Sequence, residues 1–157
     1  MEENENIVCS KCEGIIEKDD DFCPGCGTLL AEFVKCENHS GRDAKGVCVI
    51  CAEPYCEECG IFVDDRIFLC AGHSEYDTLE GMAAVYSNGD TIQIGLAKAN
   101  LEEKGLHPFV YLKKANTVGT SLIYNSYDIN EYQLMVPFLE VLTAEEILRD
   151  LDLIDEK

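Results

Sequence analysis

The chain has 157 residues, and its 31 acidic and 12 basic side chains give a formal charge of −19. Nucleic-acid binding draws much of its affinity from Lys and Arg side chains that neutralise phosphates, and this sequence contains no basic cluster. The charge therefore argues against a nucleic-acid partner and against an anionic membrane surface. Solubility is a sufficient reason for the acidic excess.

The N-terminus sets the expected compartment. The first residues, "MEENENIV", have neither the basic region nor the apolar stretch of a secretory signal. No window approaches the roughly 20 apolar residues of a membrane span. We therefore expect a cytoplasmic protein with reduced thiols, in which ten cysteines indicate metal binding rather than disulfides.

All ten cysteines lie in the first half of the chain, and with two histidines they form six pairs, each enclosing two residues. The pairs are Cys9 with Cys12, Cys23 with Cys26, Cys36 with His39, Cys48 with Cys51, Cys56 with Cys59, and Cys70 with His73. Two ligands on one tight turn can reach a single metal, and two such pairs complete a tetrahedron. The twelve ligands therefore predict three zinc ions per chain, in closed structural sites without an open catalytic position.

Three other uses of these cysteines are weaker. Disulfides would leave the two histidines in register by chance. A thioredoxin-type redox site normally carries one such pair in a β-α-β setting. Iron–sulfur binding remains an alternative, but the two histidines count against it.

Residues 7–33 contain the first two pairs and form the first expected module. Gly27 follows the last ligand and permits the left-handed backbone that closes a ligand turn, while Pro24 fixes φ within that turn. We expect residues 14–22, "GIIEKDDDF", to form a hairpin. The segment resembles the short zinc ribbons at the N-termini of many prokaryotic proteins, which implies a role in protein interaction or as a spacer.

Residues 36–75 carry the other four pairs. The alternating apolar residues of "GIFVDDRIFLC" predict a hairpin that turns at Asp64 and Asp65. Spacing alone permits either sequential or interleaved pairing of the ligands, and the four-residue link between the middle pairs favours interleaving. We expect a small core around the metals, formed by Val47, Val49, Tyr55, Ile61, Val63, Ile67 and Leu69.

The eight ligands in this order resemble a B-box-type zinc finger in its prokaryotic form. The resemblance implies a cross-brace and a role in protein association. One zinc would be held by Cys36, His39, Cys56 and Cys59, and the other by Cys48, Cys51, Cys70 and His73. The ligand order does not match a RING finger, so we do not expect ubiquitin-ligase activity.

Residues 80–157 contain no cysteine and predict an α+β module in the order β-α-β-β-α. We expect strands over 81–87, 106–113 and 131–137. We expect one helix over 91–104, with Asp90 at its N-cap and Gly105 just past its end. We expect a second helix over 142–153, where Thr143 and Glu146 fit a capping box, with a start several residues earlier as the alternative.

The stretch from "AVYSNGDTIQIGLAKANLEEKGLHPFVYL" to "YQLMVP" is similar to a small prokaryotic signal-transducing domain of PII-like, ferredoxin-like shape. The resemblance implies a role in signal transduction. The ligand of this family is itself unclear. The loop over 114–130 is longer than in the family, and "FLEVL" replaces the acidic residues that usually follow Val-Pro. No ligand-binding residue is therefore carried over.

Candidate chemistry in this module is sparse. His107 could act as a general base, although a packing or surface role is the simpler interpretation. Four tyrosines around the long loop could line a binding patch or pack on strands: Tyr111, Tyr124, Tyr127 and Tyr132. No phosphate-binding loop and no Ser/His/Asp set can be argued.

The whole pattern predicts small zinc-stabilised modules, a ribbon and a cross-brace finger, followed by an α+β ferredoxin-like domain. We expect a non-enzymatic zinc-binding adaptor or regulatory protein with a protein partner. The alternative is a small-molecule sensor whose C-terminal module binds a ligand. Whether that module also forms a homo-oligomer is left open by the sequence.

Overall fold

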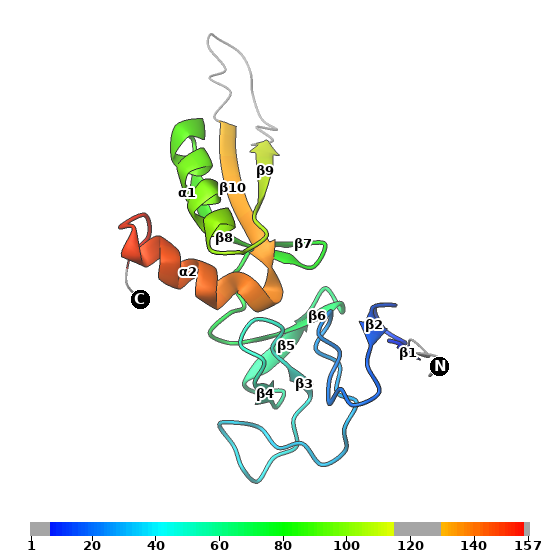
Figure 1. Ribbon diagram of the computed structural model, residues 1–157. Coiled ribbons are helices and arrows are strands. Elements are labelled where there is room, and N and C mark those ends of the chain that lie inside the picture. The colour runs from blue at the N-terminus through cyan, green and yellow to red at the C-terminus, as the bar shows by residue number, and fades with distance from the viewer. Residues whose placement is uncertain (1–6, 115–129, 156–157) are drawn as a thin grey trace, which may run out of the picture. The chain divides into compact units, whose positions relative to one another are not determined.

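The computed structural model describes residues 7–114 and 130–155. The chain divides into two compact units, Met1–Tyr76 and Asp77–Lys157 (Figure 1). Unit 1 holds all the predicted zinc ligands, and unit 2 is the α+β part. Neither α-helix in the described residues has the length and apolar character needed to cross a membrane.

In the described part of unit 1, six short strands form three antiparallel pairs. The pairs are β1 (Ile7–Val8) with β2 (Ile15–Ile16), β3 (Gly46–Val47) with β4 (Pro54–Tyr55), and β5 (Gly60–Val63) with β6 (Ile67–Cys70). Isolated two-stranded hairpins are at best marginally stable in water. The turns and ligands between the strands must therefore contribute much of the stability of this unit.

The hairpin expected over residues 14–22 is wrong. Ile15 and Ile16 pair instead with Val8 and Ile7, on the other side of the first cysteine pair. Phe22 likewise bridges to Leu29, across the second cysteine pair. The reason is that each ligand turn itself reverses the chain and brings its own flanking residues together.

The hairpin expected at Asp64 and Asp65 is confirmed by the pairing of β5 with β6. Both aspartates have positive φ, at 50° and 55°, and the Arg66 N–H donates to the Val63 carbonyl at 2.9 Å. Positive φ at both central residues is the mark of the type I′ turn, whose twist matches that of the strands it joins.

Phe68 lies buried at the centre of unit 1, among three glycines. A Cβ added at Gly46 or Gly60 would come within 2.6 Å of the Phe68 ring, and one at Gly27 within 2.9 Å of the Phe68 Cβ. The expected core is correct for Val47, Val49 and Leu69 and wrong for Ile61, which is exposed. Alternation of apolar residues misses Phe68 because its partners are glycines, which give no hydrophobic signal.

Backbone hydrogen bonds tie the first two cysteine pairs to the rest of unit 1. The Val47 N–H donates to the Gly27 carbonyl at 2.8 Å, and the Phe68 N–H donates to the Cys26 carbonyl at 2.8 Å. The Val49 N–H donates in turn to the Phe68 carbonyl at 3.1 Å. Residues 7–33 and 36–75 therefore share one core within unit 1.

Unit 2 contains a curled antiparallel sheet with strand order β7-β8-β10-β9. Its strands are β7 (Thr78–Leu79), β8 (Met82–Asn88), β9 (Phe109–Lys114) and β10 (Asn130–Pro137). Its helices are α1 (Thr91–Glu103) and α2 (Val141–Asp150), the latter preceded by the 3₁₀ turn η1 (Phe138–Glu140). Because β8 and β9 both run antiparallel to β10, they are parallel to each other and joined by α1.

The elements of unit 2 follow the expected order, with corrections at their ends. Asp90 caps α1, since its Oδ1 accepts from the Ile92 N–H at 2.8 Å, and Gly105 has φ +84° just past the helix. The capping box expected at Thr143 is wrong, because α2 begins at Val141 without a side-chain cap. Strand β7 was not expected, since two residues are too few to show alternation.

The two helices pack against β8, β10 and each other, and so cover one face of the sheet (Figure 1). The buried helix residues are Ile94, Ala97 and Leu101 in α1 and Val141, Ala144, Glu145 and Leu148 in α2. Alternation along β10 places the fully buried Leu134 and Val136 on the helix side. Gln133 and Met135 lie on the opposite face, which we call the Gln133 face.

Candidate metal centres

Three of the six ligand pairs lie on turns of one kind, Cys9–Glu13, Cys23–Gly27 and Cys48–Ala52. In each, the N–H of the fifth residue donates to the carbonyl of the first cysteine, at 2.9, 2.8 and 2.8 Å respectively. The fifth residue has positive φ in all three: Glu13 61°, Gly27 79° and Ala52 59°. This turn closes the loop tightly enough to place both sulfurs on one side of it.

The other three pairs lie on a second kind of turn, Cys36–His39, Cys56–Cys59 and Cys70–His73. Here the N–H of the second ligand donates to the carbonyl of the first, at 3.3, 3.0 and 3.0 Å respectively. Both kinds of turn bring ligands three positions apart to a common point, which is the physical content of the two-residue spacing.

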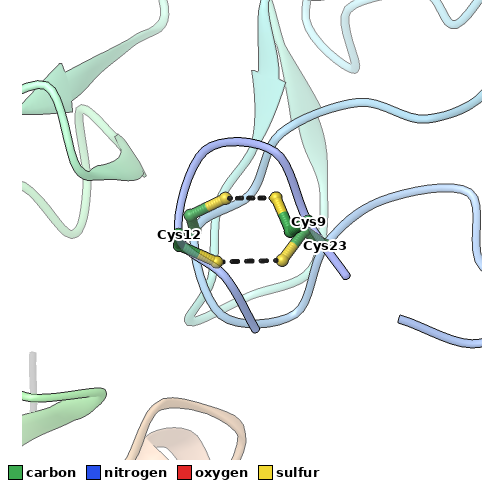
Figure 2. A group of neighbouring side chains, drawn as sticks. Cys9, Cys12 and Cys23 are labelled. Carbon is green, nitrogen blue, oxygen red and sulfur yellow. Dashed lines mark hydrogen bonds between the residues drawn. The ribbon is translucent and has the colours of Figure 1, made fainter. Parts of the chain in front are cut away.

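The twelve predicted ligands gather in three groups, and within each group the four ligand atoms lie within 4.8 Å of one another. Site 1 is Cys9, Cys12, Cys23 and Cys26; site 2 is Cys36, His39, Cys56 and Cys59; site 3 is Cys48, Cys51, Cys70 and His73. In site 1 the sulfurs of Cys9, Cys12 and Cys23 point toward one another (Figure 2). Sites 2 and 3 have the interleaved grouping, so the sequential alternative does not hold in this structure.

The ligand separations fit a tetrahedral zinc ion. Ligands about 2.3 Å (sulfur) or about 2.1 Å (nitrogen) from zinc lie about 3.5–3.8 Å apart in a tetrahedron. The Cys9 and Cys26 sulfurs are 3.8 Å apart, and His39 Nδ1 is 3.6 Å from the Cys56 sulfur. All ten cysteines are free of disulfides. The expectation of three Zn²⁺ per chain is therefore confirmed by the donor sets and their spacing.

Crowding of the thiols gives each site a need for positive charge. A hydrogen bond with the Cys51 side chain lowers the pKa of Cys48 to about 4, and the same contact raises the pKa of Cys51. In site 1, burial raises the pKa of Cys23 to about 12. The four thiolates of site 1, and the three of site 2 or site 3, repel one another when they are so close together, and a bound cation removes that penalty.

Polar groups beyond the twelve predicted ligands contact the ligand sulfurs. The Thr28 hydroxyl oxygen lies 3.0 Å from the Cys26 sulfur, and the Tyr55 hydroxyl lies 3.8 Å from the Cys51 sulfur. In site 2, Asn38 Nδ2 donates to the Cys59 sulfur at 3.6 Å. Arg42 pairs with Glu58, and both residues line a hollow together with Cys56. Such partners fix ligand orientation, and the only sequence signal for Thr28 and Asn38 is their closeness to a ligand.

His107 lies far along the chain from the metal ligands and has a partner of its own. Its Nδ1 is 2.6 Å from Glu140 Oε1, and its backbone N–H donates to Glu140 Oε2 at 2.8 Å. The pair connects the residues before β9 to the turn before α2. This geometry gives His107 a structural task, and its role as a general base stays a hypothesis.

The four tyrosines around the long loop, considered either as a binding patch or as packing residues, lie only partly within the described residues. Tyr111 lies on β9 and Tyr132 on β10, where Tyr132 pairs with Leu112 and Asn88. Tyr124 and Tyr127 lie outside the described residues. Tyr111 instead helps to line a hollow of about 230 Å³ on the Gln133 face, with Asp77, Thr78, Leu79, Lys113, Gln133 and Met135.

Asp77 is the charged centre of this hollow. Gln133 Nε2 donates to its carboxylate at 2.7 Å, and Lys113 Nζ donates to the same oxygen at 3.2 Å. These contacts, with Gln133 the larger, hold the pKa of Asp77 below its ordinary value of 3.8. The carboxylate is therefore ionised at neutral pH.

Comparison of the chain with models of known protein families, with curated proteins and with solved structures found no match in any of the three.

Proposed function

We propose that this chain is a non-enzymatic zinc-binding adaptor or regulatory protein that mediates protein–protein interaction. The observation that carries the proposal is that each zinc site has four protein ligands. A catalytic zinc keeps a position for water or substrate, whereas a four-ligand site supplies folding energy and rigidity. The zinc ions would then hold a surface in shape for a partner.

Unit 1 has a feature suited to that role. Phe33 is 87% exposed and has φ +63°, which is a strained conformation for a bulky side chain. It lines a hollow of about 440 Å³ whose other residues include the acidic Glu32 and Asp43. An exposed aromatic beside acidic groups suits a partner with an apolar pocket and a basic rim.

The resemblances noted in the sequence agree with this proposal. Zinc ribbons and B-box-type fingers serve mainly in protein association, and a PII-like, ferredoxin-like unit 2 would add signal transduction. In this proposal the protein acts in the cytoplasm of a prokaryote.

Cross-linked affinity purification from the source cells tests the proposal. We expect the tagged wild-type chain to retain one protein in near-stoichiometric amount. Phe33→Ala should lose that protein while keeping three zinc ions per chain. The matched control Ile92→Ala removes another exposed apolar side chain, on α1, and should retain it. Retention that is equal in all three chains would contradict the assignment of Phe33, and no retained protein would contradict the adaptor function.

A second candidate function rests on the hollow of the Gln133 face. Its polar side chains, Asp77, Lys113 and Gln133, lie beside apolar Leu79 and Met135, a combination that can orient a small ligand. In this alternative, unit 2 is a small-molecule sensor. Equilibrium dialysis against cell extract, followed by mass spectrometry, would detect a ligand that Gln133→Leu no longer binds.

A further inference from the structure

Strand β9 is an edge strand with unusual exposure. Among the described residues its one strand partner is β10. The run Phe109–Leu112 carries no charge, and three of its side chains are exposed: Phe109 by 54%, Tyr111 by 39% and Leu112 by 36%. Natural edge strands are usually shortened, bulged or charged against pairing with other chains. Strand β9 ends in Lys113 and Lys114, but its first four residues carry no such charge and form a candidate pairing surface.

The two faces of β9 differ in chemistry. Phe109 is in register with Met135, and Tyr111 with Gln133, so both aromatic rings lie on the Gln133 face. Val110 is in register with the buried Leu134, on the helix side. The Gln133 face of β9 is therefore aromatic, with Lys113 following at the next position, and its helix face is aliphatic.

We propose that β9 pairs antiparallel with β9 of a second copy of this chain, with Tyr111 on the two-fold axis. In this register Tyr111 faces Tyr111 of the partner subunit, and Phe109 faces Lys113 of the partner subunit. On the helix side, Val110 faces Leu112 of the partner subunit. The two sheets would form one continuous sheet, because directly opposite residues share a face.

The occupant is a second copy because the strand is complementary to itself. An aromatic pair, a lysine beside an aromatic ring and an aliphatic pair are each stabilising cross-strand combinations. All three arise from one register, and that register keeps each face of one copy continuous with the same face of the other. Shifting it by one residue would place aromatic and aliphatic faces on the same side.

Electrostatics gives this dimer a characteristic salt dependence. Each copy carries a formal charge of −19, so two copies repel at low ionic strength. At about 0.15 M salt the screening length is about 8 Å, and repulsion between distant charges largely disappears. We therefore expect the dimer to strengthen as salt is added, because its contacts are mainly apolar.

Sedimentation velocity of the zinc-loaded full chain, from about 1 µM to about 500 µM, tests the proposal. We expect a concentration-dependent dimer that Tyr111→Lys weakens at least about tenfold, because two lysines would then meet at the axis. The matched control Leu96→Lys changes a 53% exposed leucine of α1 and should dimerise like the wild type. Each variant adds one positive charge to the chain, so long-range repulsion cannot separate them.

Amide hydrogen exchange of the wild type provides a second measurement that needs no variant. Amides of β9 that point away from β10 should become protected as concentration rises. A wild type that stays monomeric throughout would overturn the proposal, and any pairing partner of β9 would then have to be a different protein. A dimer that forms without protection of β9, or that Tyr111→Lys and Leu96→Lys affect equally, would place the interface elsewhere and also overturn it.

Discussion

Thr28 lies two residues after the ligand Cys26, and its hydroxyl oxygen is 3.0 Å from the Cys26 sulfur. A hydroxyl that donates to a thiolate stabilises the charged form that zinc requires. We expect Thr28→Val, which keeps the shape and removes the hydroxyl, to lose zinc from site 1 about tenfold more readily. Thr28→Ser keeps the donor and should behave like the wild type. The measurement is zinc release to a coloured chelator, and equal release by both variants would contradict this role.

Asp77 makes a pH-dependent contribution to unit 2. Its pKa is lowered in the folded state by Gln133 and then by Lys113, so its stabilisation is present above the ordinary value of 3.8. That stabilisation is lost as pH falls through the lower folded value. We expect the wild type to exceed Asp77→Asn by at most about 1 kcal/mol near neutral pH, because the ion pair is largely exposed.

The difference between the wild type and Asp77→Asn should vanish in acid, where the protonated carboxyl resembles the amide. Amide exchange of β8 and β10 is the suitable measurement, since acid also releases zinc from unit 1. Glu80→Gln removes one negative charge from the same region and should keep the wild-type profile. A gap that persists at the lowest pH would show that the charge is not its source.

At the scale of the element, three of the six ligand turns share one backbone design, with Glu13, Gly27 or Ala52 at its fifth position. Gly27 occupies it without strain, while Ala52 holds nearly the same conformation at φ 59°. A left-handed conformation costs a residue with a Cβ about 1–2 kcal/mol. Glycine avoids this cost, but it loses more conformational entropy on folding, which offsets part of the stabilisation.

We therefore expect Ala52→Gly to stabilise unit 1 by about 0.5–1 kcal/mol. The matched variant Ala44→Gly changes an alanine that does not have positive φ, and it should destabilise by about the same amount. Thermal unfolding at fixed free zinc compares the two. If both variants lose stability alike, the left-handed position is not strained in the folded protein.

Ligand spacing was sufficient to predict the three sites, because tetrahedral coordination by pairs of ligands on tight turns permits few spacings along the chain. Helix signals at Asp90 and Gly105 were equally direct, since caps act within one turn. The ribbon hairpin over 14–22 was wrong because the chain is reversed by the ligand turns, a constraint that apolar alternation does not contain. Phe68 was missed because its pocket is formed by Gly27, Gly46 and Gly60. Glycines have no side chain, so they add nothing to an apolar pattern in the sequence.

At the scale of the whole molecule, the two units draw on different sources of stability. Buried positions in unit 1 are largely ligand cysteines, joined by a few side chains such as Phe68 and Leu69. Structural zinc contributes about 10–16 kcal/mol in small zinc-finger peptides at neutral pH. Unit 2 instead buries a conventional apolar core that includes Leu101, Leu134 and Leu148, and it should fold through that burial.

A strong chelator should therefore unfold unit 1 and leave unit 2 folded. The Phe68 and Val47 backbone hydrogen bonds join site 1 to the rest of unit 1, so we expect the three zinc ions to leave in one cooperative step. Charge repulsion cannot be the cause of this unfolding. Ten thiolates and three Zn²⁺ would take the formal charge from −19 to −23, so the protonated metal-free chain is less negative.

Amide-resolved NMR with and without chelator, alongside elemental analysis, is the deciding measurement. We expect three zinc ions per chain before chelation, loss of dispersion for residues 7–76, and unchanged resonances for residues 77–114 and 130–155. Resonances of unit 2 that collapse together with those of unit 1 would mean that the units depend on one core. Release of zinc in separate steps would instead mean that the contacts around Phe68 couple the sites only weakly, leaving each ligand group to fold by itself.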